Sequence, residues 1–193
     1  MVNIVTAQNS PKTVQPLADR IMDRYPEVVS VINNITSRKA GVAVGDVEHT
    51  LAGANVFSDN IGRFEFEISA NSFFQTNTRG AALLFKTIEK YAGLSGTEAV
   101  LDLYSGTGTI PILLSEGSKT VTGIEIVESA VADAVKNCRN NDISNCRFIK
   151  GDIRKCLSQI AQRPDVVIID PPRAGMHKDV VKQVIELAAG RMI

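Results

Sequence analysis

The chain has 193 residues, of which 44% are hydrophobic and 22% are charged, so it can bury a sizeable core and is not a disordered segment. Its formal net charge of +0 argues against a large basic surface for nucleic acid, because phosphate binding is mainly electrostatic. The three cysteines form no CxxC pair, and no apolar run reaches membrane-spanning length. These features argue against a zinc site, an iron–sulfur site and a disulfide framework, and they predict a soluble, cytoplasmic protein.

The first 70 residues predict a small α+β subdomain. A helix is expected over residues 13–25, just ahead of Pro26. The basic turn 37–41 could contact phosphate or could be a solvated turn. Short strands separated by turns are expected over residues 2–7, 28–35, 41–51 and 63–69.

Residues 71–193 predict a second domain in which strands alternate with helices. Such alternation favours a Rossmann-like α/β fold, with helices on both faces of a parallel sheet. The expected strands are 99–105, 120–127, 147–152 and 165–170. The expected helices are 77–92, 109–116, 128–141, 153–161 and 178–189.

A glycine turn follows the first strand of this domain, in the sequence LDLYSGTGTIPI (101–112). Gly106 and Gly108 allow a sharp bend and the close approach of a ligand, and the next helix offers unpaired N–H groups. An ordinary strand-to-helix turn would look the same. Glu125 at the end of the second strand favours a nucleotide-like ligand, because a carboxylate there reaches ribose hydroxyls in Rossmann-like sheets. The alternative is a solvated glutamate.

The residues around this turn favour S-adenosylmethionine over a dinucleotide. Pro111 stands where a dinucleotide site has its third glycine, and it has no N–H to offer. A rim of acids is expected at the strand ends, and it would repel a pyrophosphate but tolerate a sulfonium. Asp152 could accept from the adenine amino group, could cap the helix after it, or both. The expected members of the rim are Asp102, Glu125, Asp152 and Asp170.

The fourth strand ends in Asp170-Pro171-Pro172-Arg173. Two prolines fix the geometry of this loop, which would hold Asp170 beside a methyl donor and a target base. A plain proline loop is the alternative. Arg173 could meet RNA or pair with a neighbouring acid.

Five segments together resemble the RNA uracil-C5 (5-methyluridine) methyltransferases: NSFFQTN, DLYSGTGT, GIEIVESAV, GD and DPPRAG. The resemblance implies an S-adenosylmethionine-dependent enzyme that forms 5-methyluridine in RNA, with ribosomal RNA favoured over transfer RNA. Gln75 would hold the methionine part and Glu125 the ribose. Asp152 would lie by the adenine and Asp170 by the transferred methyl group. The implied cofactor site comprises Gln75, Tyr104, Gly106, Gly108, Thr109, Glu125, Asp152 and Asp170.

The resemblance also implies that the catalytic residues lie after Ile193. In that family a cysteine in an S-C-N-P motif follows the fifth strand and a glutamate base comes later, so the chain is expected to be truncated. Cys138, Cys146 and Cys156 are expected to be structural, because none falls on a loop after the fourth or fifth strand. Three alternatives remain open: an exocyclic-amine RNA methyltransferase, a non-catalytic binding module and an NAD-dependent oxidoreductase.

Overall fold

The computed structural model describes residues 1–7, 11–37, 45–75, 77–160 and 162–193. Its contacts separate two compact units. Unit 1 comprises Met1–Asp59 and Glu67–Ser72, and unit 2 comprises Asn60–Phe66 and Phe73–Ile193. Most of the basic turn 37–41 and the start of the strand predicted over 41–51 lie outside the described residues.

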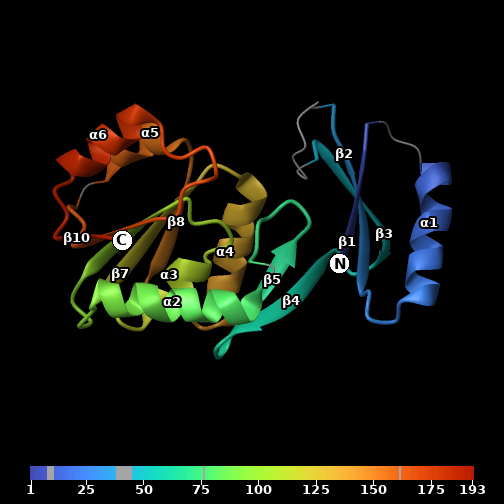
Figure 1. Cartoon of the computed structure of the whole chain (residues 1–193), viewed down its shortest axis with the longest axis horizontal. Helices are drawn as coiled ribbons and strands as arrows, with labels where there is room; N and C mark the ends of the chain where they lie inside the picture. Colours follow the sequence, from blue (N-terminus) through green and yellow to red (C-terminus); the bar gives the residue numbers. More distant parts are fainter. Residues whose placement is uncertain (8–10, 38–44, 76, 161) are drawn as a thin grey trace. The chain divides into compact units, whose positions relative to one another are not determined.

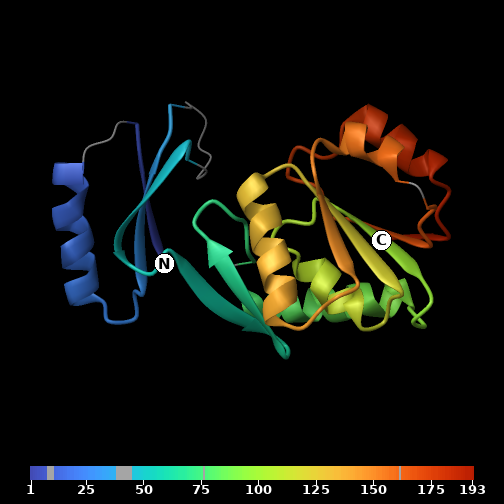
Figure 2. The same cartoon turned by 180° about the vertical axis from the view of Figure 1, so that it is seen from behind.

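Unit 1 contains a three-stranded sheet with one helix (Figures 1 and 2). Strands β1 (Val2–Thr6) and β2 (Ser30–Ile35) run parallel, and β3 (Val47–Gly53) pairs antiparallel with β2. Helix α1 (Pro11–Arg24) makes the crossover that two parallel neighbours require. The helix lies against β2 and β3, and the buried apolar residues of α1 and β2 are Val14, Ala18, Val31 and Ile32.

A hairpin of β4 (Val56–Ile61) and β5 (Phe64–Ser69) contributes residues to both units. Its turn contains Gly62 at φ 63°, a conformation that glycine adopts without strain. The sequence predicts β5 from its alternation, and Phe64, Phe66 and Ile68 are indeed buried. It does not predict β4, because the central Ser-Asp-Asn of that strand has a low β propensity.

Unit 2 contains a five-stranded parallel sheet, which confirms the predicted Rossmann-like fold. The strands are β6 (Ala99–Leu103), β7 (Thr120–Glu125), β8 (Cys146–Lys150), β9 (Val166–Ile169) and β10 (Arg191–Met192). Their order across the sheet is β10-β9-β6-β7-β8. The core of this sheet is apolar on both faces, as expected for strands covered by helices on each side, and includes Leu101, Leu103, Val121, Ile124, Val166 and Val167.

Helices cover both faces of the sheet, with α2, α3 and α4 on one face and α5 and α6 on the other (Figures 1 and 2). The segment after β6 leads to a helix on one face, and the segment after the neighbouring strand β9 leads to a helix on the other face. This switch in direction opens a crevice at the carboxyl ends of the two strands. Within the described ranges, none of the helices combines the length and apolar character that a bilayer crossing needs. The helices are α2 (Thr78–Ala92), α3 (Thr109–Ser115), α4 (Glu128–Asn140), α5 (Ile153–Cys156) and α6 (Lys178–Glu186).

Two predicted helices extend well past the observed ends, whereas the other predicted helices of unit 2 agree to within one residue at each end. The helix expected over 153–161 is α5 followed by the 3-10 turn η1 (Leu157–Gln159); residue 161 lies outside the described part. Ser158 Oγ donates to the Lys155 carbonyl at 2.9 Å, a side-chain bond that competes with regular helix. Helix α6 ends at Glu186 rather than 189, because Ala188 turns into the left-handed region at φ 47°.

Candidate functional site

The glycine turn between β6 and α3 lies at the centre of the crevice. Tyr104 opens it at φ 68°, an unfavourable conformation for an aromatic residue. The Ile124 carbonyl of β7 accepts from the backbone N–H groups of Tyr104 and Ser105 at 3.0 and 3.1 Å. These two bonds hold the strained backbone, as is common where a loop is shaped for a ligand.

The two glycines of the turn serve different purposes. A Cβ on Gly106 would meet nothing nearer than the Phe73 carbonyl oxygen at 4.0 Å, so this position leaves space above the backbone. A Cβ on Gly108 would lie 2.9 Å from Ala134 Cβ and from Phe148 Cζ. Gly108 is therefore required for packing of the turn against α4 and β8, whereas Gly106 is favoured by its backbone conformation at φ 53°.

Glu125 holds the end of β7 against the glycine turn. Its Oε2 accepts from the Gly106 N–H at 3.0 Å, and its Oε1 accepts from the N–H groups of Ile126 and Val127 at 2.7 and 2.8 Å. An ionised carboxylate can accept about four hydrogen bonds, so three of these sites are already in use. Glu125 can accept from one ribose hydroxyl directly, whereas a second would have to replace a backbone donor.

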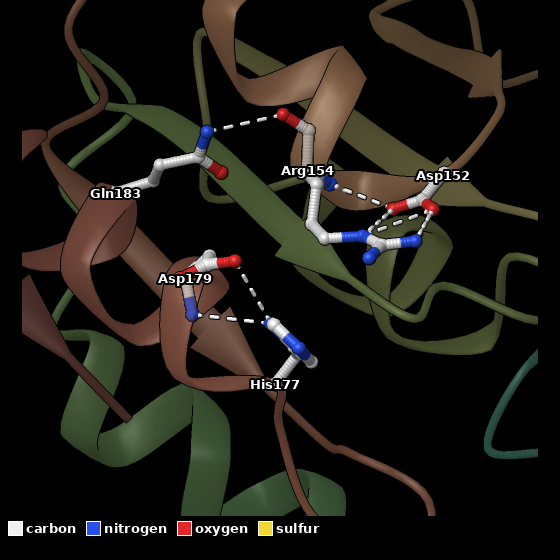
Figure 3. Close-up of polar contacts among 5 residues, drawn as sticks. All are labelled: Asp152, Arg154, His177, Asp179 and Gln183. Atoms are coloured by element: carbon white, nitrogen blue, oxygen red, sulfur yellow. Dashed lines mark hydrogen bonds and ion pairs between the residues drawn. The ribbon is translucent and has the colours of Figure 1, made fainter.

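Asp152 and Arg154 form a tight pair at the end of β8 (Figure 3). Asp152 caps α5, because its Oδ1 accepts from the Arg154 N–H at 2.9 Å. The guanidinium folds back on the same carboxylate, with Nε at 3.0 and 3.1 Å from the two oxygens and Nη2 in contact with Oδ2. Hydrogen bonds from the Arg154 side chain, followed by its backbone, lower the pKa of Asp152 to about 2. The sequence left open whether Asp152 caps the helix that follows it, and the structure shows that it does.

A cleft of about 310 Å³ lies between β7, α5 and α6. Its walls are mainly apolar, with two carboxylates, Glu125 and Asp152, among the polar lining groups. His177 lies at its edge and caps α6, where its Nδ1 accepts from the Asp179 N–H at 3.2 Å (Figure 3). A cleft of this kind suits a ligand with a flat, apolar ring and polar groups at the edges of that ring. The lining residues are Tyr104, Ile124, Glu125, Ile126, Gly151, Asp152, Ile153, Arg154, Gly175, His177 and Val180.

A second, smaller cavity of about 50 Å³ lies on the other side of the glycine turn. Tyr104 borders both cavities. Seven of the eight site residues expected from the sequence line one or both of these cavities, and Gly108 lines neither. The lining residues of the smaller cavity are Phe73, Phe74, Gln75, Phe85, Tyr104, Ser105, Gly106, Thr107, Thr109, Ile110 and Asp170.

Asp102 does not lie on the acidic rim where the sequence placed it. The side chain is 0% exposed on β6, because the strand runs through the middle of the sheet and its central positions face packed helices. Both carboxylate oxygens are buried and make no hydrogen bond within the described part of the chain. Burial, followed by the charges of Asp170 and Glu125, raises its pKa well above the ordinary value.

The acids that line the two cavities provide a test of the cofactor inferred from the sequence. Glu125 and Asp152 line the larger cleft and Asp170 lines the smaller cavity, whereas Arg154 is the one Lys or Arg side chain among the described lining residues of both. S-adenosylmethionine carries a sulfonium and an ammonium, whereas a dinucleotide carries a negative pyrophosphate. The residues present therefore fit the sulfonium cofactor and do not fit the dinucleotide.

Several lining residues escaped the sequence analysis. Ile126 and Val180 resemble any other apolar residue of a strand end or helix, and their sequence context gives no signal. Arg154 also escaped, because side chains two residues apart do not face each other on a helix, and its guanidinium reaches Asp152 only by folding back onto the cap. His177 was expected only as a polar residue near the start of a helix.

A larger cavity of about 430 Å³ lies elsewhere in unit 2 and contains none of the expected site residues. It is lined by Arg63, Phe64 and residues around the end of α3 and the 141–145 loop. This is the edge where the strands begin, whereas ligands of open α/β sheets bind at the carboxyl ends. The two cavities around Tyr104 are therefore the candidate site.

The cysteines lie on α4, β8 and α5, and Cys146 is the first residue of β8, one position before the start predicted for that strand. Cys138 and Cys156 are buried, Cys146 is half-buried, and none lines either cavity. Burial raises the pKa of the Cys156 thiol, which makes it a poor nucleophile.

Residues 94–189 match the family model described as a methyltransferase domain. The parallel sheet and the cavities at its carboxyl edge agree with this match. Residues 94–189 of unit 2 therefore resemble a methyltransferase domain, a class of domain that uses S-adenosylmethionine as its cofactor.

Other proteins with more specific names align with this chain over its whole length. It is 40% identical over 200 residues to a Chlorobaculum tepidum protein and 35% identical over 196 residues to an Enterococcus faecalis protein, both named as uncharacterized RNA methyltransferases. These alignments cover 100% of this chain but only 41% and 43% of the relatives, so the chain spans about two fifths of their length. The solved structure of Pyrococcus abyssi tRNA (uracil-54, C5)-methyltransferase with S-adenosyl-L-homocysteine matches 97% of this chain and 44% of that one, with a TM-score of 0.72 and 28% identity.

Proposed function

We propose that this chain is the cofactor-binding part of an enzyme that methylates C5 of uridine in RNA. Ribosomal RNA is the substrate we favour, and transfer RNA is the alternative. The observation that carries the proposal is the match to the Pyrococcus abyssi uracil-C5 enzyme, which extends over 97% of the chain, including unit 1 as well as the methyltransferase domain. The relatives named as RNA methyltransferases support the same substrate class.

The two cavities hold different parts of the cofactor in this proposal. Gln75 and Thr109 line the small cavity, where an amide and a hydroxyl suit the amino acid tail of S-adenosylmethionine. Glu125 and Asp152 line the larger cleft, with an acceptor for a ribose hydroxyl and one for the adenine amino group. Tyr104 lies between these parts. The bound cofactor supplies a methyl group activated by its sulfonium.

Asp170 lines the small cavity and is exposed at the end of β9, so it lies where cofactor and substrate would meet. The prolines that follow restrict the backbone beside it. Arg173, in the same loop, is exposed and available to an RNA phosphate or base.

Methylation at C5 of uracil requires a nucleophile that this site does not contain. C5 becomes reactive only after a thiolate adds to C6 of the ring, and a base must then remove the C5 proton. None of the three cysteines lines the candidate site. We propose that the nucleophilic cysteine and the base belong to sequence after Ile193, as the resemblance implies, and that the chain alone binds cofactor without turnover.

The competing functions make different products. An exocyclic-amine methyltransferase would modify guanine or adenine; such enzymes usually carry an aromatic residue after the prolines, where this chain has Arg173. A non-catalytic module would bind cofactor or RNA and form no methylated nucleoside with any added sequence.

The test is nucleoside mass spectrometry of ribosomal and transfer RNA transcripts incubated with S-adenosylmethionine. The complete gene product is expected to form 5-methyluridine, and the 193-residue chain is expected to form none while still binding S-adenosyl-L-homocysteine in calorimetry. Methylated guanosine or adenosine would establish the amine alternative. Product formed by the chain alone would contradict the placement of the nucleophile.

A further inference from the structure

Arg154 is held from both ends in the cleft beside α5. Its side chain and its own N–H all bond to Asp152, as described above. Its carbonyl accepts from Gln183 Nε2 of α6 at 3.1 Å (Figure 3). A residue fixed at backbone and side chain leaves its partner carboxylate little freedom to rotate.

We propose that Arg154 is a positioning residue that fixes the Asp152 carboxylate as an acceptor for the adenine amino group, and so makes the cleft select adenine over a 6-oxo purine. This inference rests on the proposed cofactor site. It assigns no direct contact between Arg154 and the reacting methyl group.

The cleft gives this arrangement its selectivity. The apolar walls beside the pair include Ile124, Ile153 and Val180, so a base bound against them would give up part of its water. An adenine amino group donates to a fixed carboxylate oxygen, whereas the oxygen of a 6-oxo purine would face it as a second acceptor. Two acceptors held against each other with no proton between them are costly, which is how polar sites reject close analogues.

The protonation state of Asp152 agrees with this role. Hydrogen bonds from Arg154 hold the pKa of Asp152 at about 2, so the carboxyl is ionised and only accepts at neutral pH. A guanidinium fork is needed to reach both oxygens, because an ammonium would act as a single point charge.

The experiment measures calorimetric affinities of the 193-residue chain for S-adenosyl-L-homocysteine and for its deaminated analogue S-inosyl-L-homocysteine. We expect the unmodified chain to prefer the adenine ligand by roughly tenfold or more, the value of one charged hydrogen bond. Arg154→Ala should weaken the adenine ligand about fivefold to tenfold and change the inosine ligand less than twofold. Arg154→Lys should give an intermediate ratio.

Lys155→Ala is the matched control, because Lys155 is the exposed neighbour and its replacement removes the same charge. It should leave both affinities unchanged. Asp152→Asn should lower the same ratio, and adding Arg154→Ala to it should lower the ratio no further, because the two residues act through one carboxylate.

Three results separate the hypotheses. Equal losses for both ligands in Arg154→Ala would show a merely structural role and overturn the inference. Tighter binding of the adenine ligand would show that Arg154 competes for Asp152, which also overturns it. Failure of the unmodified chain to bind either ligand would instead contradict the proposed cofactor site.

Discussion

At the residue scale, the carboxylates around the site differ in what each of them bonds to. Glu125 accepts from three backbone N–H groups, and Asp152 is paired with Arg154. Asp102 is fully buried and has no hydrogen-bond partner in the described part of the chain. The hydrogen bonds of the first two stabilise the ligand-free fold, whereas the buried Asp102 carboxyl destabilises it as the pH rises and favours ionisation.

We therefore predict that Asp102→Asn stabilises the ligand-free chain at pH 7, because a buried amide stays neutral whereas a buried carboxyl must hold a proton or carry a charge. The folded pKa of Asp102 lies above its ordinary value, so the folded state binds the proton more tightly than the unfolded state does. The cost in the unmodified chain thus appears as the pH rises above about 3.8, and the advantage of the variant should grow with it. Urea unfolding between pH 5 and pH 8 measures the difference.

Ser105→Ala is the control for this prediction, because Ser105 Oγ is also buried without a hydrogen-bond partner in the described residues but does not titrate. Its effect on stability should not vary with pH. An Asp102→Asn effect that is equally flat would contradict the assigned cause.

At the element scale, the loop between α2 and β6 is closed by its own glutamate. Glu98 Oε2 accepts from the N–H groups of Ser95 and Thr97 at 2.8 and 3.2 Å, and Oε1 accepts from Ser95 Oγ at 2.8 Å. The Ser95 hydrogen bonds, backbone first, lower the pKa of Glu98 to about 2. This loop sets the entry into β6, the strand that leads to the glycine turn.

The prediction at this scale concerns Glu98→Gln. Because the folded pKa is depressed, the stabilisation by Glu98 is complete above its ordinary pKa of 4.5 and is lost as the pH falls toward 2. The unmodified chain should therefore unfold at a higher urea concentration than the variant at pH 7, and the two midpoints should approach each other below pH 4.5. Glu89→Gln, which changes an exposed carboxylate of α2, should show no such convergence.

At the scale of the whole molecule, both cavities of the candidate site are lined entirely by residues of unit 2. Unit 1 has its own sheet and its own buried side chains. A ligand that binds only the folded form of unit 2 stabilises that unit alone.

We predict two transitions in scanning calorimetry, only one of which responds to cofactor. S-adenosyl-L-homocysteine at 100 times its dissociation constant should stabilise the responding unit by about 2.7 kcal/mol. NAD should shift neither transition, because the acids that line the cavities, Glu125, Asp152 and Asp170, disfavour a pyrophosphate. A response to NAD, or equal shifts of both transitions, would contradict the assignment of the site to unit 2.

The sequence by itself determined the alternation of strands and helices in unit 2, the glycine turn and the acidic residues near it. These are local features: apolar periodicity defines a strand, and Gly106 and Gly108 mark a sharp bend whatever surrounds them. The expected positions of Glu125, Asp152 and Asp170 followed from one geometric rule, that parallel strands end at the same edge of a sheet.

Only the tertiary structure decided which of those acids face a cavity and what already engages them. Asp102 precedes the turn by a few residues, yet the flanking strands bury it completely, and a sequence gives no measure of that. The Arg154–Asp152 pair, the three donors on Glu125 and the contact of Gly108 with Phe148 likewise depend on elements distant in the chain or on side-chain direction. Local patterns fix which elements form, whereas burial and hydrogen bonding arise from how the elements pack.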